Sequence, residues 1–255
     1  MMRAHLTIDG RRLSYLDFGG TGRPLVALHG HLSEGATFAH LAAALAPEWR
    51  VIAPDQRGQG ESDRGADYSR EGYLADLEAL LDHLNLGRVV LLGHSLGAIN
   101  AYQFAARHPG RVSALVNAEG PVVLDGGNPF GFLLGLPYSA PTREALVEGL
   151  GQAAPYFADR LRENPDGTWR LPFHPKEMYA SEANVHGDHW ADWTESDCPA
   201  LLVHASKGVI PAEQVNAMVE RRPGTTSAQV EADHLVYTAA PEEFAAAVRA
   251  FLANV

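Results

Sequence analysis

Cysteine is almost absent from this chain, because Cys198 is the only one among 255 residues and no disulfide can form within the chain. Its apolar context, "CPALLV" (198–203), indicates a buried structural thiol without a redox role. No apolar run reaches the roughly 18–20 residues that a membrane-spanning helix needs. The amino-terminal "MMRAHLTIDG" lacks the apolar core of a signal peptide. We therefore expect a cytoplasmic protein with no membrane partner.

Basic residues are also scarce, with 20 Lys and Arg against 31 Asp and Glu and a formal net charge of −11. An acidic surface repels phosphate backbones and anionic headgroups, which disfavours nucleic acid and membrane surfaces as partners. Neither GxxxxGK nor GxGxxG occurs, which disfavours a nucleotide site. The remaining composition, 46 % hydrophobic and 20 % charged, is that of a globular protein. It leaves the oligomeric state unknown.

Apolar runs and helical spacings alternate along most of the chain. Expected strands are 5–8, 11–18, 24–30, 50–55, 88–95, 112–120, 199–205 and 227–232, and expected helices are 37–47, 69–86, 96–109, 211–223 and 241–255. This alternation predicts a mainly parallel sheet with helices on both faces. The alternation is lost between about 121 and 197, where Gly, Pro and aromatic residues cluster.

This irregular stretch divides the chain. We expect residues 1–122 and 197–255 to form a core domain and residues 123–196 to form an inserted cap. An insertion there would lie over the carboxyl edge of the sheet, which is where α/β proteins bind ligands.

A serine stands between glycines in "GHSLG" (93–97), after the apolar run "RVVLL" and before a helical pattern. This G-x-S-x-G pattern requires a strand before it and a helix after it, and both are expected here. The sharp turn exposes the hydroxyl, and the helix N-terminus stabilises negative charge beside it. The pattern predicts that Ser95 is a nucleophile.

Four motifs resemble, in order, those of the α/β-hydrolase family, in its small cap-bearing form: "LHGHLSEG" (28–35), "DQRGQGESD" (55–63), "GHSLGA" (93–98) and "ADHLVYTAAPEEF" (232–244). The resemblance implies an eight-stranded twisted sheet with helices on both faces, and neither metal nor cofactor. It makes His234 the base that deprotonates Ser95. It also implies an oxyanion hole built from the backbone N–H groups of His31 and Leu96. The His31 imidazole either lines the pocket or is solvated.

The acid of the expected triad is missing from its usual place. The family carries an aspartate after the seventh strand, but "LLVHASKGVIP" (201–211) has Lys207-Gly208 there. Glu119 in "ALVNAEGP" (114–121) ends the sixth strand, and a charge directly after an apolar strand needs a partner. Haloalkane dehalogenases and zearalenone-type lactonases with a glutamate at this position resemble the arrangement. We therefore predict Ser95–His234–Glu119, with Glu213 or a water-assisted dyad as alternatives.

The substrate pocket is the least determined part of the site. His94, Phe130 and Trp190 are predicted to line it. The aromatic residues of the irregular stretch either form a small core of their own or wall an apolar pocket. They are Phe130, Phe132, Tyr138, Tyr156, Phe157, Trp169, Phe173, Tyr179, Trp190 and Trp193. A metal site in "VHGDHW" (185–190) is disfavoured, because His186 and His189 have no further spaced ligands.

These residues predict a serine hydrolase that cleaves a small-molecule carboxylic ester or lactone through an acyl-enzyme. The same fold also allows two alternative functions: a cofactor-free dioxygenase, and a ligand receptor that has lost turnover. A dehalogenase is disfavoured, because position 95 holds serine rather than aspartate.

Overall fold

The structure is a computed structural model that describes residues 1–65 and 67–255. Its main sheet has eight strands in the order β1-β2-β4-β3-β5-β6-β12-β13. They are β1 (Met2–Ile8), β2 (Arg11–Asp17), β3 (Arg23–Leu28), β4 (Trp49–Pro54), β5 (Val89–His94), β6 (Val112–Ala118), β12 (Ala200–Lys207) and β13 (Thr225–Asp233). β2 pairs antiparallel with β1 and β4, and all other pairs are parallel. The predicted mainly parallel eight-stranded sheet is confirmed.

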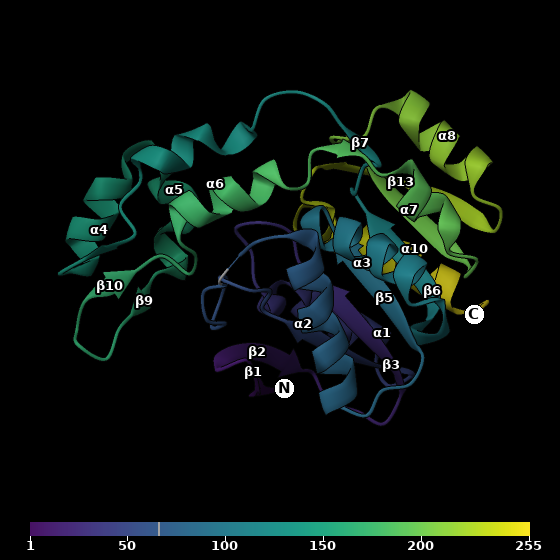
Figure 1. The fold of residues 1–255 in the computed structure, drawn as a ribbon, viewed down its shortest axis with the longest axis horizontal. Coiled ribbons are helices and arrows are strands. Elements are labelled where there is room, and N and C mark those ends of the chain that lie inside the picture. Colours follow the sequence, from purple (N-terminus) through teal and green to yellow (C-terminus); the bar gives the residue numbers. More distant parts are fainter. Residues whose placement is uncertain (66) are drawn as a thin grey trace.

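Helices cover both faces of this sheet, as predicted (Figure 1). Helices α2 (Arg70–His83), α3 (Leu96–Arg107) and α8 (Ala212–Arg221) pack on one face, and α1 (Ala39–Leu45) and α10 (Pro241–Leu252) on the other. Alternate residues of β3 belong to the two cores: Val26 and Leu28 contribute to the first, Leu25 and Ala27 to the second. A strand buried on both faces needs a continuous apolar run, which is the pattern of residues 24–28.

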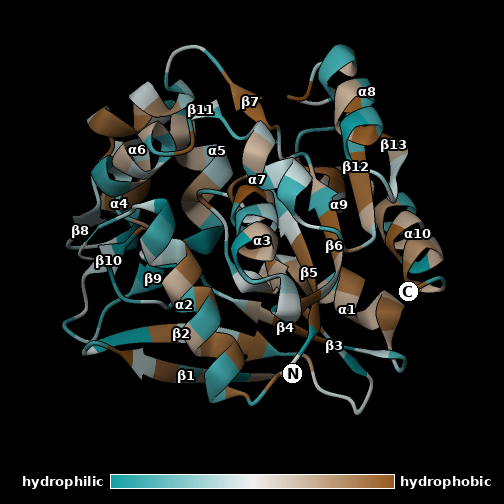
Figure 2. Cartoon of the chain, turned by 45° about the vertical axis from the view of Figure 1, so that its right-hand side comes forward, coloured by the Kyte–Doolittle hydropathy of each residue, from teal (hydrophilic) through white to brown (hydrophobic). Residues whose placement is uncertain are grey.

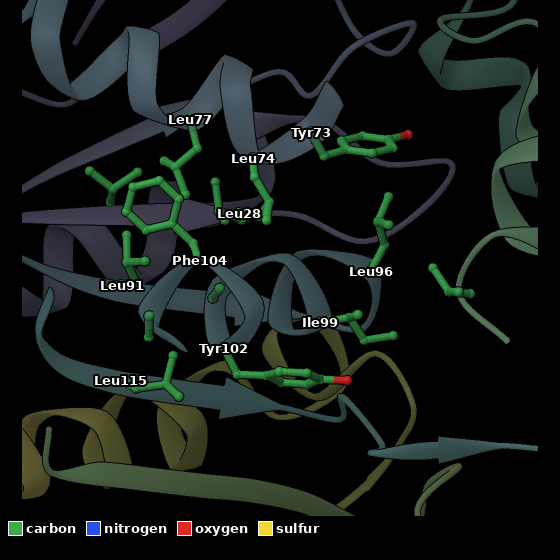
Figure 3. Close-up of a cluster of buried hydrophobic side chains, with 14 of the residues drawn as sticks. Leu28, Tyr73, Leu74, Leu77, Leu91, Leu96, Ile99, Tyr102, Phe104 and Leu115 are labelled. Atoms are coloured by element: carbon green, nitrogen blue, oxygen red, sulfur yellow. The ribbon is translucent and has the colours of Figure 1, made fainter. Parts of the chain in front are cut away.

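The core under α2 and α3 is shown in Figure 3. Leu28, Leu91 and Leu115 project from three strands toward apolar side chains of the two helices. Burial of each large apolar side chain contributes about 1.5–3 kcal/mol, so this interface holds the serine-bearing helix α3 firmly on the sheet. In Figure 2 the central strands carry mainly hydrophobic residues, whereas the helices carry both hydrophilic and hydrophobic residues.

Local signals set the ends of α2. Ser69 caps its N-terminus by accepting a hydrogen bond at Oγ from the N–H of Gly72 (3.1 Å). The helix ends at His83 rather than at the expected residue 86, because Asn85 adopts a positive φ of 52° that no helix continues through.

Between β6 and β12 the chain leaves the main sheet. This stretch forms β7 (Val123–Leu124), β8 (Ser139–Ala140), α4 (Arg143–Leu150), α5 (Ala154–Phe157), the 3₁₀ turn η5 (Ala158–Arg160), β9 (Arg162–Glu163), β10 (Trp169–Arg170), α6 (Pro175–Ala183), β11 (Gly187–Asp188) and α7 (Trp190–Glu195). β8, β10 and β9 make a small separate sheet. Figure 1 shows α4, α5, α6, β9 and β10 to the left of the main sheet. The domain boundaries at 122/123 and 196/197 stay a prediction.

None of the helices in the described ranges is both long and apolar enough to cross a bilayer.

Candidate active site

Ser95 lies at a strained turn between β5 and α3. Its backbone has φ 51° and ψ −118°, a conformation that L residues rarely adopt. Its N–H donates to the carbonyl of Ala118 (2.9 Å), which ties the turn to the end of β6. A Cβ at Gly93 would lie 2.1 Å from the carbonyl oxygen of Gly97, so glycine is required for this turn to close. The geometry matches the predicted nucleophile turn.

The loop after β3 packs directly on this turn. A Cβ at Gly30 would lie 3.3 Å from the Cβ of Ser95, and a Cβ at Gly97 would lie 2.1 Å from the carbonyl oxygen of Leu28. The backbone of His31 therefore follows a residue in close contact with Ser95. Leu96 is the first residue of α3, and the first N–H groups of a helix have no partner within it. The two predicted oxyanion donors thus belong to residues next to this turn: Leu96 follows Ser95 in the chain, and His31 follows Gly30, which packs on it.

Glu119 is completely buried at the end of β6, with 0 % exposure. Its Oε1 accepts from the N–H of Ala205 (2.7 Å), and its Oε2 accepts from the N–H of Val209 (2.8 Å). Oε2 also lies 3.1 Å from Nδ1 of His234. Because the ionised carboxylate only accepts, Nδ1 carries the proton and Nε2 of the neutral imidazole is left free to accept. This is the tautomer that a base acting on a serine needs.

The loop after β12 is built around this carboxylate. Lys207 points into solvent with 77 % of its side chain exposed and pairs with Glu231 (3.5 Å). At Gly208 a Cβ would lie 2.2–2.5 Å from the Glu119 carboxyl group. The glycine at the place of the missing acid therefore makes room for the glutamate from the neighbouring strand. Glu213 is exposed in the first turn of α8.

His234 directly follows β13, and the side chain of His94 packs against it and binds its backbone. Nε2 of His94 donates to the carbonyl of His234 (2.8 Å), and the two ring centroids are 4.7 Å apart. Burial, and then the proximity of His234, lower the pKa of His94 well below its usual range, so His94 is a neutral support. Among the described residues, no hydrogen bond joins the Ser95 hydroxyl to His234. Such bonds are often long before substrate binds.

The His31 imidazole is not solvated, since only 3 % of its side chain is exposed. Its Nε2 lies 2.8 Å from Oγ of Ser181, and its Nδ1 lies 3.1 Å from Oε2 of Glu182. Both partners belong to α6, so the loop beside Ser95 is fastened to the 123–196 segment. The sequence signalled neither partner, because α6 has no regular apolar spacing that reveals its orientation.

The predicted pocket residues lie in different places. The Phe130 ring is 5.4 Å from the His31 ring, edge to face, and thus lies next to the site. Trp190 lies on α7 beneath the guanidinium of Arg221 (4.3 Å), and no described contact joins it to Ser95 or His234. Phe157, Phe173 and Trp193 are buried in the core, and Tyr156 and Phe132 are exposed. Trp193 packs against Tyr102 of α3 (5.8 Å between ring centroids), so the buried aromatic residues join a core that the segment shares with the main sheet's helices.

His29, beneath the same loop, makes stability depend on pH. Its Nδ1 donates to the carbonyl of Gly30 (2.7 Å), and its Nε2 accepts from the N–H of Gln56 (2.9 Å), so the folded protein needs the neutral ring. Burial lowers its pKa from 6.5 to about 4. Between pH 6.5 and 4 the His29 imidazole is protonated in the unfolded chain but neutral in the folded chain. The free energy of unfolding therefore falls as pH falls. We expect the free energy of unfolding to drop by about 2 kcal/mol from pH 7 to pH 5 through this group.

Urea unfolding at pH 7, 6 and 5 measures this effect. His29→Gln is the matched control, since its amide can donate and accept at similar positions without titrating, and its stability should vary less with pH. An equal pH dependence in both proteins would assign the effect to other groups.

Residues 23–238 match the family described as alpha/beta hydrolase fold. The chain is 30 % identical to the lipase LipV of Mycobacterium tuberculosis over 244 residues, covering 89 % of this chain and 92 % of the lipase. It is 37 % identical over 119 residues to a cis-3-alkyl-4-alkyloxetan-2-one decarboxylase of Shewanella oneidensis, a match that covers 45 % of this chain and only 37 % of that protein.

Among solved structures, the chain is similar to an E-2-(acetamidomethylene)succinate hydrolase. The TM-score is 0.83 with 25 % identity, and the match covers 99 % of both chains.

Proposed function

Because the chain belongs to the alpha/beta-hydrolase family, we propose that it is a serine hydrolase of small-molecule carboxylic esters or lactones. Ser95 is its nucleophile, His234 its base and Glu119 the orienting acid. The 3.1 Å contact between His234 Nδ1 and Glu119 Oε2 carries the proposal. A receptor that had lost turnover would have no need to keep this carboxylate buried against the imidazole. The similarity to LipV and to the succinate-derivative hydrolase supports hydrolysis.

The proposed reaction has two halves. Nε2 of His234 takes the proton of Ser95 as Oγ bonds to the carbonyl carbon, and the N–H groups of His31 and Leu96 hold the oxyanion. The C–O bond to the alcohol then breaks, and the alcohol leaves with the proton from His234. Water, deprotonated by the same imidazole, attacks the acyl-enzyme and releases the acid. Glu119 stabilises the imidazolium in both halves.

Residues 123–196 form the cap in this proposal. They close over the carboxyl edge of the sheet through the contacts of Ser181 and Glu182 with His31. Phe130 lines the entrance beside His31.

Two measurements on the wild-type protein test the proposal. We expect hydrolysis of p-nitrophenyl acetate and butyrate, and a covalent adduct with a fluorophosphonate, in which Ser95 Oγ bonds to phosphorus and fluoride leaves. Intact-mass spectrometry and peptide mapping should place one adduct on Ser95, and heat-denatured protein should gain none. Absence of both turnover and adduct would refute the proposal, and an adduct on another serine would refute the assignment of Ser95.

A further inference from the structure

Leu32 has a backbone conformation that leucine rarely adopts. Its φ is 59°, which lies in the left-handed region. The other non-glycine residues of the described ranges with a positive φ are Asp9, Asn85, Ser95 and Glu119. Asp and Asn tolerate this region because their short polar side chains can bond locally, whereas leucine gains no such support. Leu32 therefore shares its strain with two members of the proposed triad, and such strain persists only where the surrounding structure enforces it.

The 123–196 segment holds the chain at Leu32 and at the residue before it. Nη1 of Arg160, which ends the turn η5, donates to the carbonyl of Leu32 (2.6 Å). Nδ1 of His31 lies 3.1 Å from Oε2 of Glu182, and its Nε2 lies 2.8 Å from Oγ of Ser181. The strained residue and the predicted oxyanion donor are thus both fastened to a segment that is distant in the sequence.

Anchors on either side of Leu32 confine any change of its φ to a few residues. Before it, the chain is fixed in β3, which ends at Leu28. After it, Glu34 is only 7 % exposed and accepts from Arg162 of the 123–196 segment (2.6 Å). A change in φ at Leu32 must therefore be taken up between these anchors, where His31 lies. No carbonyl in the described ranges accepts from the N–H of His31, which leaves this donor for a substrate.

We propose that the 123–196 segment sets the geometry of the oxyanion hole. Arg160 and Glu182 are positioning residues: they hold Leu32 at its positive φ and thereby orient the N–H of His31 toward the reacting carbonyl. This inference rests on the proposed function, since it concerns the same site. An oxyanion donor acts on charge that develops in the transition state, so a change in its orientation alters kcat rather than KM.

Arg160→Ala tests the proposal with p-nitrophenyl butyrate as the substrate. Without its anchor, a leucine occupies the left-handed region about 5- to 30-fold less readily than the ordinary regions. We therefore expect kcat per active site to fall by about 5- to 30-fold, with KM within about twofold of the wild type. Active sites are counted by titration with the fluorophosphonate, so that unfolded protein does not lower the measured kcat.

Leu32→Gly provides the rescue, because glycine adopts positive and negative φ about equally readily. In the Arg160→Ala protein this second substitution should restore kcat to within about threefold of that of Leu32→Gly alone. A defect that Arg160→Ala causes elsewhere in the fold would not be repaired by removing the Leu32 side chain. Arg107→Ala is the control, because Arg107 is exposed and pairs with Glu71 on the surface, and its kcat should equal that of the wild type.

The φ of Leu32, measured by crystallography or backbone NMR in the wild type and in Arg160→Ala, separates this inference from the proposed function. A Leu32 that leaves the left-handed region in Arg160→Ala, in a protein that hydrolyses no ester, would support the positioning by Arg160 and refute the esterase. In an active esterase, an unchanged kcat in Arg160→Ala, a loss that appears in KM instead, or a loss that Leu32→Gly does not repair would overturn the inference and leave the proposed function standing.

Discussion

Ser95→Ala is expected to lower kcat for p-nitrophenyl butyrate by on the order of 10⁶-fold, the size of loss found when a serine hydrolase loses its nucleophile. Without Oγ no acyl-enzyme forms, and His234 is left with only water to activate. Alanine has the same Cβ and the same backbone constraints as serine, so the strained φ of 51° is retained. The thermal midpoint should therefore stay close to that of the wild type, which separates loss of chemistry from loss of fold.

The matched control is Ser206→Ala, because Ser206 is exposed on β12 and makes only one long contact, 3.5 Å from its Oγ to the carbonyl of Ala232. Its kcat should equal that of the wild type. Initial rates, with active sites counted by the p-nitrophenol burst, measure the effect. If purified Ser95→Ala kept more than about a thousandth of the wild-type rate, a different group would carry the reaction.

Apolar runs and helical spacings predicted the sheet, whereas the candidate site residues Ser95, His234 and Glu119 also required the resemblance to a known family. Apolar runs identified the central strands β3, β4, β5, β6 and β12, because a strand that is covered on both faces has to be apolar along its length. Glu119 was predictable for a second reason. A charged residue at the end of such a strand needs a buried partner, and the usual acid was missing after β12.

The reason for that absence could not be read from the sequence. Gly208 stands where its Cβ would meet the Glu119 carboxyl group, and this requirement exists only once β6 and β12 lie side by side. The 123–196 segment posed the same difficulty. Its short helices have little periodicity, so nothing in the sequence indicated that Glu182 would face His31 or that Arg160 would reach Leu32.

Glu119→Gln is expected to lower kcat by about 10⁴-fold, the loss found when an amide replaces the acid of a Ser-His-Asp enzyme. Three donors converge on the carboxylate: the N–H groups of Ala205 and Val209, and Nδ1 of His234. An amide offers one oxygen and one NH₂. In either orientation the NH₂ group, which is a donor, therefore stands opposite at least one of these N–H donors. If NH₂ faces His234, the ring turns to the tautomer with a proton on Nε2 and can no longer accept from Ser95.

The same substitution should also destabilise the fold, by about 1–3 kcal/mol, because at least one buried N–H group loses its acceptor. Urea unfolding measures this loss. The value of kcat is measured at urea concentrations well below those that unfold the variant. Glu213→Gln is the control, since Glu213 is exposed on α8 and its removal should change neither quantity. A folded Glu119→Gln within tenfold of the wild-type rate, or a large loss in Glu213→Gln, would contradict the assignment. A single substitution should lower both the free energy of unfolding and kcat only if the carboxylate has two roles. It accepts the N–H groups of the β12 loop, and it sets the tautomer of the base.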